Sequence, residues 1–390
     1  MKIYNTLSRE KENFVPIKNG EVSIYVCGVT PYDTTHLGHA FTYVSFDALI
    51  RYLKFKGYKV NYTQNVTDID DDVLRKARET NVNWIKLGNF WTDKFLHDLN
   101  FLNVFPPTNY VKATGSIAKI IEIVSDLINK KLAYENKGNV YFNVSKFKKY
   151  GELSRYTREQ MVLISKERGG DPSDVLKINP LDFILWQKTK IGEPFWQSPW
   201  GKGRPGWHIE CSAMINTYLG KQIDIHGGGR DLVFPHHESE IAQSESYTGK
   251  SPFVKYWMHT SMVIFEGEKM SKSLGNMVMV SDLSKKFSAN TIRFLLLSHH
   301  YKEPWEFDYS EIEEAQKKIS MIEKILDKKS DGESDISLWN ECESFLDNDL
   351  DTPKALDLIF KTAEKINSGN AKQGAVNFVK KGLEVLGFYF

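Results

Sequence analysis

Two histidines flank a glycine in the segment His36-Leu-Gly-His39, which lies between a predicted strand and a predicted helix. Glycine lets the backbone approach a ligand closely, and the N–H groups at a helix N-terminus favour a phosphate. Two imidazoles beside these N–H groups could therefore bind the phosphates of a nucleotide. Taken alone the pattern is short, and two histidines in a loop are as often structural or incidental.

A basic segment, Lys269-Met-Ser-Lys-Ser273, supplies two ammonium groups and two hydroxyls directly after Glu266-Gly-Glu268. Such a loop can neutralise the charge that develops during phosphoryl or nucleotidyl transfer. A single basic loop is usually a solvated turn. The two segments in this order, 230 residues apart from His39 to Lys269, are typical of class I aminoacyl-tRNA synthetases and their relatives.

A third group of residues could hold a metal ion. Cys27 ends a predicted strand, Cys211 lies in Trp207-His-Ile-Glu-Cys211, and His236 shares a face of a predicted helix with Glu240. This donor set suits Zn²⁺, so we predict a zinc site of Cys27, Cys211 and His236, with Glu240 as a fourth candidate ligand. An open coordination position could bind a substrate thiolate and so distinguish cysteine from serine. In the alternative interpretation both cysteines are buried apolar residues.

The composition is that of an ordinary globular protein. In 390 residues, 41% are hydrophobic and 26% charged, which excludes disordered, collagen-like and low-complexity chains. The net charge of +1 gives no overall attraction for a polyanion. Three cysteines are too few for a disulfide framework, and neither a signal peptide nor a long apolar segment is present. We therefore expect a cytoplasmic protein that does not enter a membrane.

Strand and helix patterns alternate along the first part of the chain, which predicts a parallel α/β sheet of the Rossmann type. The segment 113–204 has a different pattern, with loops containing Gly and Pro, and is predicted to be an insertion. The expected elements are strands Val22–Val26, Tyr58–Val66 and Ile223–His226, helices His39–Lys56, Asp68–Thr80, Ile117–Lys131, Trp207–Leu219 and His236–Tyr247, and a hairpin around Gly138.

Helical periodicity dominates after residue 281. We predict a catalytic domain over 1–280, with the insertion at about 113–204 and the basic segment within 250–280, followed by a helical bundle over 281–390. The bundle has 15 Lys+Arg and 20 Asp+Glu, a net charge of −5. A domain of this charge is expected to bind nucleic acid poorly.

Four segments resemble the cysteinyl-tRNA synthetase superfamily, and the similarity runs essentially from end to end. They are Cys27–His39, Gln64–Asp71, Gly203–Cys211 and Phe234–Glu238. The superfamily contains cysteinyl-tRNA synthetase and the mycothiol-pathway ligase, which joins cysteine through its adenylate to the amine of glucosaminyl-inositol.

Several features resemble the ligase: Glu167-Arg-Gly-Gly-Asp-Pro172, Asp72, the segment Asp349–Leu356 and a chain that ends at Phe390 without an anticodon-binding module. Glu240 and His226 resemble the synthetase instead. Weighing these, we expect an ATP-dependent, AMP-forming ligase that makes a C–N amide bond from L-cysteine and glucosaminyl-inositol, as a monomer or weak dimer that binds no tRNA. The alternatives are a cysteinyl-tRNA synthetase lacking the anticodon-binding domain and a non-catalytic sensor of cysteine or its adenylate.

The resemblance also implies roles for individual residues. His36, His39, Lys269 and Lys272 would act on the phosphates of ATP, which binds with Mg²⁺, and one Zn²⁺ per chain would anchor the substrate sulfur. Asp231 is a candidate general base for the amine. The residues expected to hold the adenylate are Cys27, Gly28, Val29, Thr30, Thr42, Asn65, Val66, Thr67, Trp207, Gly229, Arg230, Asp231 and Val263.

Overall fold

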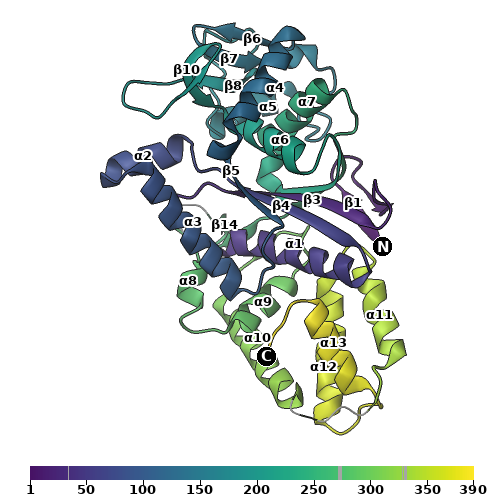
Figure 1. Cartoon of the computed structure of the whole chain (residues 1–390). Coiled ribbons are helices and arrows are strands. Elements are labelled where there is room, and N and C mark those ends of the chain that lie inside the picture. The colour runs from purple at the N-terminus through teal and green to yellow at the C-terminus, as the bar shows by residue number, and fades with distance from the viewer. Residues whose placement is uncertain (34, 271–274, 327, 329–331) are drawn as a thin grey trace.

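The computed structural model describes residues 1–33, 35–270, 275–326, 328 and 332–390. Figure 1 shows three parts one above another: the insertion at the top, a parallel sheet across the middle and a helical bundle at the bottom. Among the described residues, no helix combines the length and apolar character needed to cross a bilayer.

The central sheet has the strand order β12-β11-β3-β4-β5, and every pair is parallel. Its strands are β3 (Glu21–Val29), β4 (Lys59–Val66), β5 (Asn109–Lys112), β11 (Ile223–Gly229) and β12 (Val254–Thr260). The strand order therefore reverses between β3 and β11. In an open parallel sheet, ligands bind at such a reversal, beyond the carboxyl ends of the strands. The predicted fold class is confirmed.

Helices cover both faces of the sheet. Helix α1 (Leu37–Phe55) is mostly buried and lies between the sheet and the bundle, whereas α6 (Trp207–Tyr218) and α7 (Glu238–Thr248) lie on the side of the insertion (Figure 1). Helices α2 (Asp71–Thr80) and α3 (Trp84–Phe101) connect β4 to β5. Because α1 begins shortly after β3 ends, its first turn faces the strand reversal.

The insertion forms an antiparallel sheet of its own with the order β6-β7-β8-β10-β9. The strands are Ala133–Asn136, Asn139–Phe142, Phe183–Lys188, Gly201–Pro205 (β10) and Trp196–Ser198 (β9), and the helices are α4 (Ile117–Asn129) and α5 (Arg158–Glu167). Its apolar core includes Ile120, Phe142 and Trp186. Glu238 of α7 joins the insertion to the layer of the central sheet, since the Glu238 carboxylate accepts the N–H groups of Gly151 and Ser154 at 2.8 and 2.9 Å.

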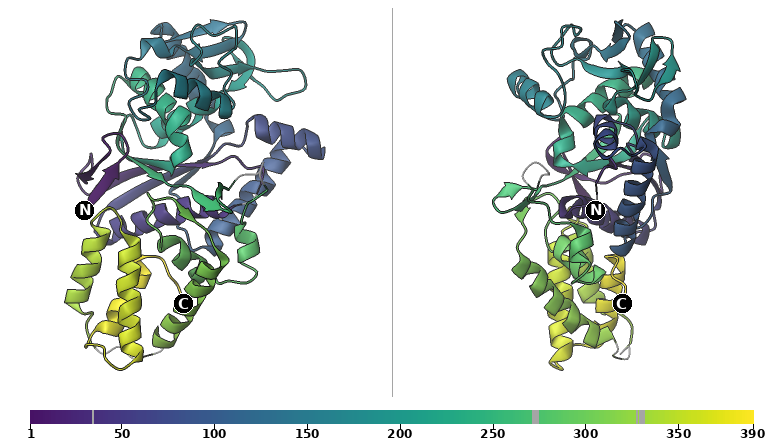
Figure 2. Two further views of the ribbon diagram at one scale, coloured as in Figure 1. Left: turned by 180° about the vertical axis from the view of Figure 1, so that it is seen from behind. Right: turned by 90° about the vertical axis from the view of Figure 1, so that its left-hand side faces the viewer.

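The bundle packs directly beneath α1, as both views of Figure 2 show. It comprises α9 (Ala289–Leu297), α10 (Tyr309–Leu326), α11 (Ile336–Leu346), α12 (Thr352–Asn367) and α13 (Ala375–Val385), preceded by the short helix α8 (Val280–Leu283). Arg293 of α9 is fully buried and donates to Asp47 of α1 and to the carbonyl of Leu386. One apolar core thus extends from α1 through the bundle.

The segment after residue 281, where helical periodicity dominates, also contains a short strand that its sequence pattern did not predict. Strand β15 (Trp305–Glu306) pairs in parallel with β13 (Val263–Phe265), whose other neighbour is β14 (Glu268–Lys269). The Trp305 ring packs edge-on against Phe41 of α1, with centroids 5.7 Å apart. The buried indole holds Trp305 and its neighbour in an extended conformation. A strand of two residues is too short to be recognised from a sequence pattern. A separate hairpin, β1 (Lys2–Asn5) and β2 (Glu10–Asn13), begins the chain.

Candidate active site

A cleft of about 1090 Å³ opens at the carboxyl ends of β3 and β11, between the sheet and the insertion. Many residues predicted to bind the nucleotide line it. They are Cys27, Gly28, Val29, Thr30, His36, His39, Thr42, Trp207, Gly229, Asp231 and Val263. The insertion contributes the opposite wall through residues 168–171, within the segment that resembles the ligase signature. The cleft thus lies where the strand order reverses between β3 and β11, which is where an open parallel sheet binds its ligands.

The two histidines of the first segment lie at the start of α1. His36 is the N-cap residue, and its Nδ1 accepts the N–H of His39 at 3.3 Å. The two imidazoles stack with their centroids 3.7 Å apart. A Cβ atom at Gly38 would lie 3.0 Å from the His36 ring, so only glycine fits without displacing that ring. Both imidazoles therefore sit at a helix N-terminus beside the cleft, a position that suits an anion.

Four of the residues expected at the adenylate do not line the cleft. Asn65, Val66 and Thr67 are buried behind its wall, and Arg230 is exposed outside it. Asn65 supports the wall, because its Oδ1 accepts the N–H of Gly28 at 2.8 Å. A Cβ at Gly28 would lie 1.6 Å from the Asn65 carbonyl oxygen, so glycine is required there.

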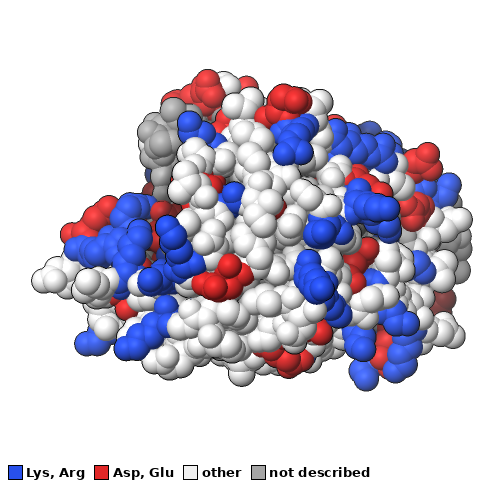
Figure 3. All heavy atoms as spheres, turned by 90° about the horizontal axis from the view of Figure 1, so that it is seen from above, with Lys and Arg blue, Asp and Glu red and all other residues white. Residues whose placement is uncertain are grey.

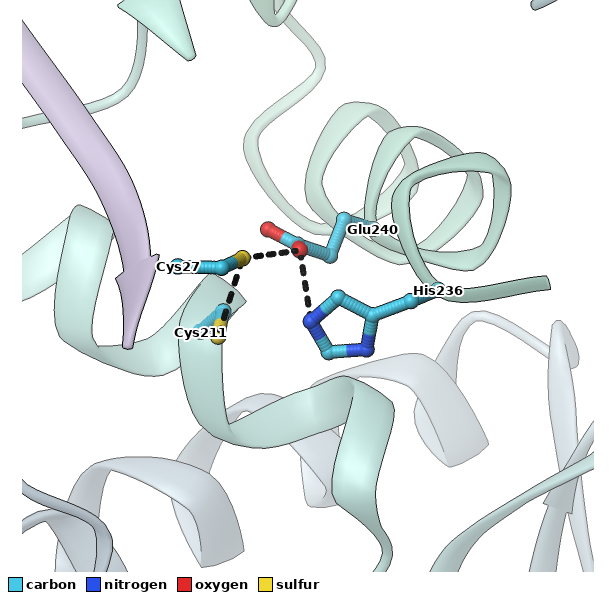
Figure 4. A group of neighbouring side chains, drawn as sticks. All are labelled: Cys27, Cys211, His236 and Glu240. Atoms are coloured by element: carbon cyan, nitrogen blue, oxygen red, sulfur yellow. Dashed lines mark hydrogen bonds and ion pairs between the residues drawn. The ribbon is translucent and has the colours of Figure 1, made fainter. Parts of the chain in front are cut away.

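The predicted zinc ligands come together from β3, α6, α7 and the helical turn Val233–His237 that precedes α7 (Figure 4). The Sγ atoms of Cys27 and Cys211 are 4.0 Å apart, Cys27 Sγ is 4.0 Å from Glu240 Oε1, and His236 Nε2 is 3.0 Å from the same oxygen. All four donor atoms lie within 4.8 Å of one another, and all four residues are buried. Tetrahedral Zn²⁺ with Zn–S bonds of about 2.3 Å separates two sulfurs by about 3.8 Å. The donor set and its spacing therefore fit zinc, with Glu240 as well placed as the other three.

Aromatic and histidine side chains surround this cluster. Trp207 stacks on His236 at a centroid distance of 4.3 Å, and His208 Nδ1 lies 3.0 Å from His236 Nδ1. On the other side, His226 Nε2 is 2.9 Å from Glu240 Oε2. Partners of this kind fix the orientation of metal ligands.

Two further buried histidines lie beside the cluster, and one of them, His237, contacts it directly. His237 Nε2 lies 3.3 Å from Cys27 Sγ, and His237 Nδ1 lies 2.7 Å from His259 Nε2. Burial lowers the pKa of His237 well below its ordinary value and that of His259 to about 3, so both rings are neutral. Sequence reasoning missed His208, His237 and His259, although His208 and His237 directly adjoin the predicted residues Trp207 and His236.

The cluster favours charged forms of three of its members despite burial. The hydrogen bond from Cys27 and the charge of His236 lower the pKa of Cys211 to about 6. The negative charges of Cys211 and Glu240 raise the pKa of His236 to about 10, and the two neighbouring histidines lower that of Glu240 to about 2. Cys27, in contrast, has its pKa raised by burial. Two anionic donors, Cys211 and Glu240, thus surround one cationic imidazole, and a metal ion would take the place of the His236 proton.

Asp231 and the basic segment Lys269–Ser273 are the remaining parts of the predicted site. Asp231 Oδ2 lies 3.2 Å from Arg168 Nη1, so this candidate base forms an ion pair with the insertion. Lys269 belongs to β14, but its side chain and the whole of Lys272 lie outside the described residues. The roles of Lys269 and Lys272 at the phosphates therefore remain predictions from the sequence.

Residues 13–317 match the family described as tRNA synthetases class I (C) catalytic domain. The chain belongs to the class I tRNA synthetases. It is 45% identical over 380 residues to a cysteine–tRNA ligase of Dehalococcoides mccartyi, covering 96% of this chain and 82% of that one. It is 42% identical to a cysteine–tRNA ligase of Thermococcus onnurineus, covering 100% and 86% of the two chains. As a class I synthetase the protein is an ATP-dependent ligase, and this prediction is confirmed.

Solved structures of other class I synthetases share the fold. Methionyl-tRNA synthetase of Mycobacterium tuberculosis with methionyl-adenylate superposes with a TM-score of 0.67 at 14% identity, covering 94% of this chain and 89% of that one. An Agrobacterium radiobacter LeuRS in complex with tRNA and LeuAMS gives a TM-score of 0.68 at 11% identity, covering 96% and 84%. At these identities the likeness establishes the class I fold alone.

Proposed function

We propose that the protein activates L-cysteine as cysteinyl-adenylate and transfers the cysteinyl group to a tRNA. The observation that carries this proposal is the buried cluster of Cys27, Cys211, His236 and Glu240 beside the cleft. Relatives called cysteine–tRNA ligase match at 42–45% identity over more than four fifths of their length, which supports the same substrate.

In the first step the cysteine carboxylate attacks the α-phosphate of ATP, forming the adenylate and releasing pyrophosphate. His36 and His39, at the N-terminus of α1, stabilise the negative charge on the phosphates. Lys269 and Lys272 would act on the β- and γ-phosphates. Trp207, stacked on His236, excludes water from the pocket of the side chain.

Cys27, Cys211 and His236 would hold zinc, and the substrate thiolate would bind the metal by taking the place of Glu240 or by adding to the four donors. The chain's own residues hold the site in shape: His208 orients His236, and His226 orients Glu240. Serine offers a hydroxyl that binds zinc far more weakly, so the site selects cysteine.

The acceptor proposed here differs from the one that the sequence analysis favoured. The relatives are cysteine–tRNA ligases, which supports tRNA over glucosaminyl-inositol and does not support the expected absence of tRNA binding. The bundle charge of −5 does not describe the rest of the chain, because charge is unevenly distributed. The insertion, 113–204, has 16 Lys+Arg and 10 Asp+Glu, a net charge of +6. Figure 3 shows the molecule from the side of the insertion, with basic groups spread over that face.

Two residues that resemble the synthetase support the same acceptor. His226 and Glu240 form a buried pair 2.9 Å apart, and Glu240 belongs to the cluster itself. The domain division at residue 280 and the monomeric or weakly dimeric state remain predictions.

One experiment compares the two acceptors. The zinc-loaded chain is supplied with ATP, Mg²⁺ and radiolabelled L-cysteine, and then with either a cysteine tRNA or glucosaminyl-inositol. We expect cysteine-dependent ATP–pyrophosphate exchange without any acceptor and label on the tRNA only. Label on the sugar amine with none on the tRNA would restore the amide-forming ligase.

A variant tests the metal. Cys211→Ala should lose bound zinc and cysteine activation together, whereas Cys342→Ala, a buried cysteine of the bundle, should lose neither. Full activity in metal-free protein would contradict the zinc proposal.

A further inference from the structure

Glu210 is a buried carboxylate that nothing described so far uses. It lies in the first turn of α6, is 1% exposed and borders the cleft. Neither of its two oxygens makes a hydrogen bond of good geometry among the described residues. Burial raises the pKa of Glu210 well above its ordinary value and outweighs the effect of the Thr67 hydroxyl, which is close enough to lower this pKa. Leaving a buried carboxylate without a partner is costly, so such a group calls for a ligand.

The neighbouring carboxylates differ in that each has a partner within the chain. Asp68 accepts the N–H and the hydroxyl of Thr114 at 3.0 and 2.7 Å, and Asp70 accepts the N–H of Val73 at 2.9 Å. Asp71 pairs with Arg204 at 2.5 Å. Glu210 is thus the member of this acidic group that remains available to a bound molecule.

The metal cluster does not account for Glu210. Successive residues of a helix point about 100° apart, so Glu210 and Cys211 face different directions. Among the described residues, two groups of donors are close enough to share one ion, and neither contains Glu210. The cation expected to pair with Glu210 is therefore not the metal ion of the cluster.

We propose that Glu210 is a specificity-determining residue that binds the α-ammonium group of the amino-acid substrate. This inference rests on the proposed function. Only two carbon atoms separate the sulfur of cysteine from its nitrogen, so a substrate whose sulfur is anchored at the cluster keeps its ammonium close to the cluster. Glu210 directly precedes Cys211 in α6 and borders the same cleft, which makes it the carboxylate we assign to this ammonium. The carboxyl group then points along the cleft towards His36 and His39, where activation takes place.

The arrangement gives three anchoring points on one small molecule: sulfur at the cluster, nitrogen at Glu210 and carboxylate at the phosphates. A thiol without an ammonium group would leave Glu210 buried and unpaired. Sites with buried polar groups strongly reject analogues that cannot satisfy them. Glu210 therefore discriminates α-amino acids from other cellular thiols, a selection that zinc coordination of sulfur cannot make.

The test measures equilibrium binding to the zinc-loaded chain for two matched pairs of thiols. L-Cysteine is compared with 3-mercaptopropionate, which lacks the amino group, and cysteamine with 2-mercaptoethanol, in which a hydroxyl replaces the ammonium. In the unaltered protein the ammonium-bearing member of each pair should bind about 10- to 100-fold more tightly. Equal affinities within both pairs would overturn the proposal without any variant.

Glu210→Gln keeps the shape of the side chain and removes its charge. It should weaken L-cysteine and cysteamine by about 10- to 100-fold and leave 3-mercaptopropionate and 2-mercaptoethanol unchanged or tighter. Zinc content should be unaltered. If all four thiols weaken equally, Glu210 has a merely structural role and the proposal is wrong.

Glu238→Gln is the matched control, since Glu238 is also a buried glutamate near the cluster but binds Gly151 and Ser154 of the insertion. It should leave the ratio within each pair unchanged. If the protein does not use cysteine at all, the result is distinguishable from a failure of the Glu210 proposal. The unaltered protein would then bind neither L-cysteine nor cysteamine when zinc is present.

Discussion

His208 Nδ1 lies 3.0 Å from His236 Nδ1, which leaves Nε2 of His236 facing Glu240 at 3.0 Å. One ring nitrogen of His236 is thus occupied by a neighbouring imidazole and the other is directed into the cluster. The position of His208 is itself fixed, because Gln243 donates to its backbone carbonyl. The hydrogen bond between the two rings sets which nitrogen of His236 is available to a metal.

Replacing His208 by phenylalanine keeps an aromatic ring against Phe183 and Trp207 but removes this hydrogen bond. We expect His208→Phe to lower zinc affinity by about 10- to 100-fold, the usual effect of losing a partner of a metal ligand. Competition with a chelating dye measures this affinity. His97→Phe, at an exposed position, is the control. Unchanged zinc affinity in His208→Phe would show that the ring contact is incidental.

Asp70 should make stability depend on pH. Burial and the charge of Asp72 raise its pKa from 3.8 to about 6, although the N–H of Val73 opposes this shift. A raised carboxyl pKa means that the folded protein holds the proton more tightly. Its contribution to stability is therefore fully present below about pH 3.8 and is lost as the pH rises through about 6.

Asp70→Asn still offers an oxygen to cap α2 but cannot ionise. The variant should unfold with a free energy about 1–3 kcal/mol larger than that of the unaltered protein near neutral pH, and this gain should shrink as the pH falls towards about 4. Urea unfolding of both metal-free proteins across this pH range measures it. If the difference in unfolding free energy between the two proteins does not change with pH, Asp70 does not have a raised pKa in the folded protein.

Lys272 tests the role of the basic segment. Lys272→Ala should slow cysteine-dependent ATP–pyrophosphate exchange by about 100-fold or more, the scale for losing one contact to a developing charge. Cysteine binding in the absence of ATP should not change. Lys285→Ala, an exposed lysine that pairs with Asp282, serves as the control. An exchange rate equal to that of the unaltered protein would remove Lys272 from the mechanism.

The charge of the insertion makes a prediction about tRNA. Lys166 and Lys190 are exposed lysines of the insertion, and Lys190 borders the cleft. Replacing both by alanine should weaken tRNA binding and reduce the slope of log affinity against log salt by about 1 to 2, since each phosphate contact contributes about 0.7–0.9. Pyrophosphate exchange should be unaffected.

Lys317 and Lys361 of the bundle form the matched pair of controls, since both are exposed and pair with acids of their own helices. Their replacement by alanine should leave the salt dependence as it is. If the bundle pair has the larger effect, the insertion is not the main phosphate-binding surface.

The sequence by itself determined the fold class and selected the four residues that the fold brings together as a possible metal site. Alternating strand and helix patterns specify a parallel sheet because burial on both faces requires apolar strands joined by amphipathic helices. Cys27, Cys211, His236 and Glu240 could be selected from the chain because thiolates, imidazoles and carboxylates are few and their metal chemistry is specific.

Only the tertiary structure decided which residues surround those donors. His237 is adjacent to His236 in sequence, yet it points to Cys27 and His259 while His236 faces Glu240. Likewise Asn65 supports the wall of the cleft from behind, and Arg230 lies outside it. The direction of a side chain and the availability of a buried carboxylate such as Glu210 depend on contacts between distant segments. Local sequence patterns record burial and periodicity, and they carry no information about which distant segment supplies the partner.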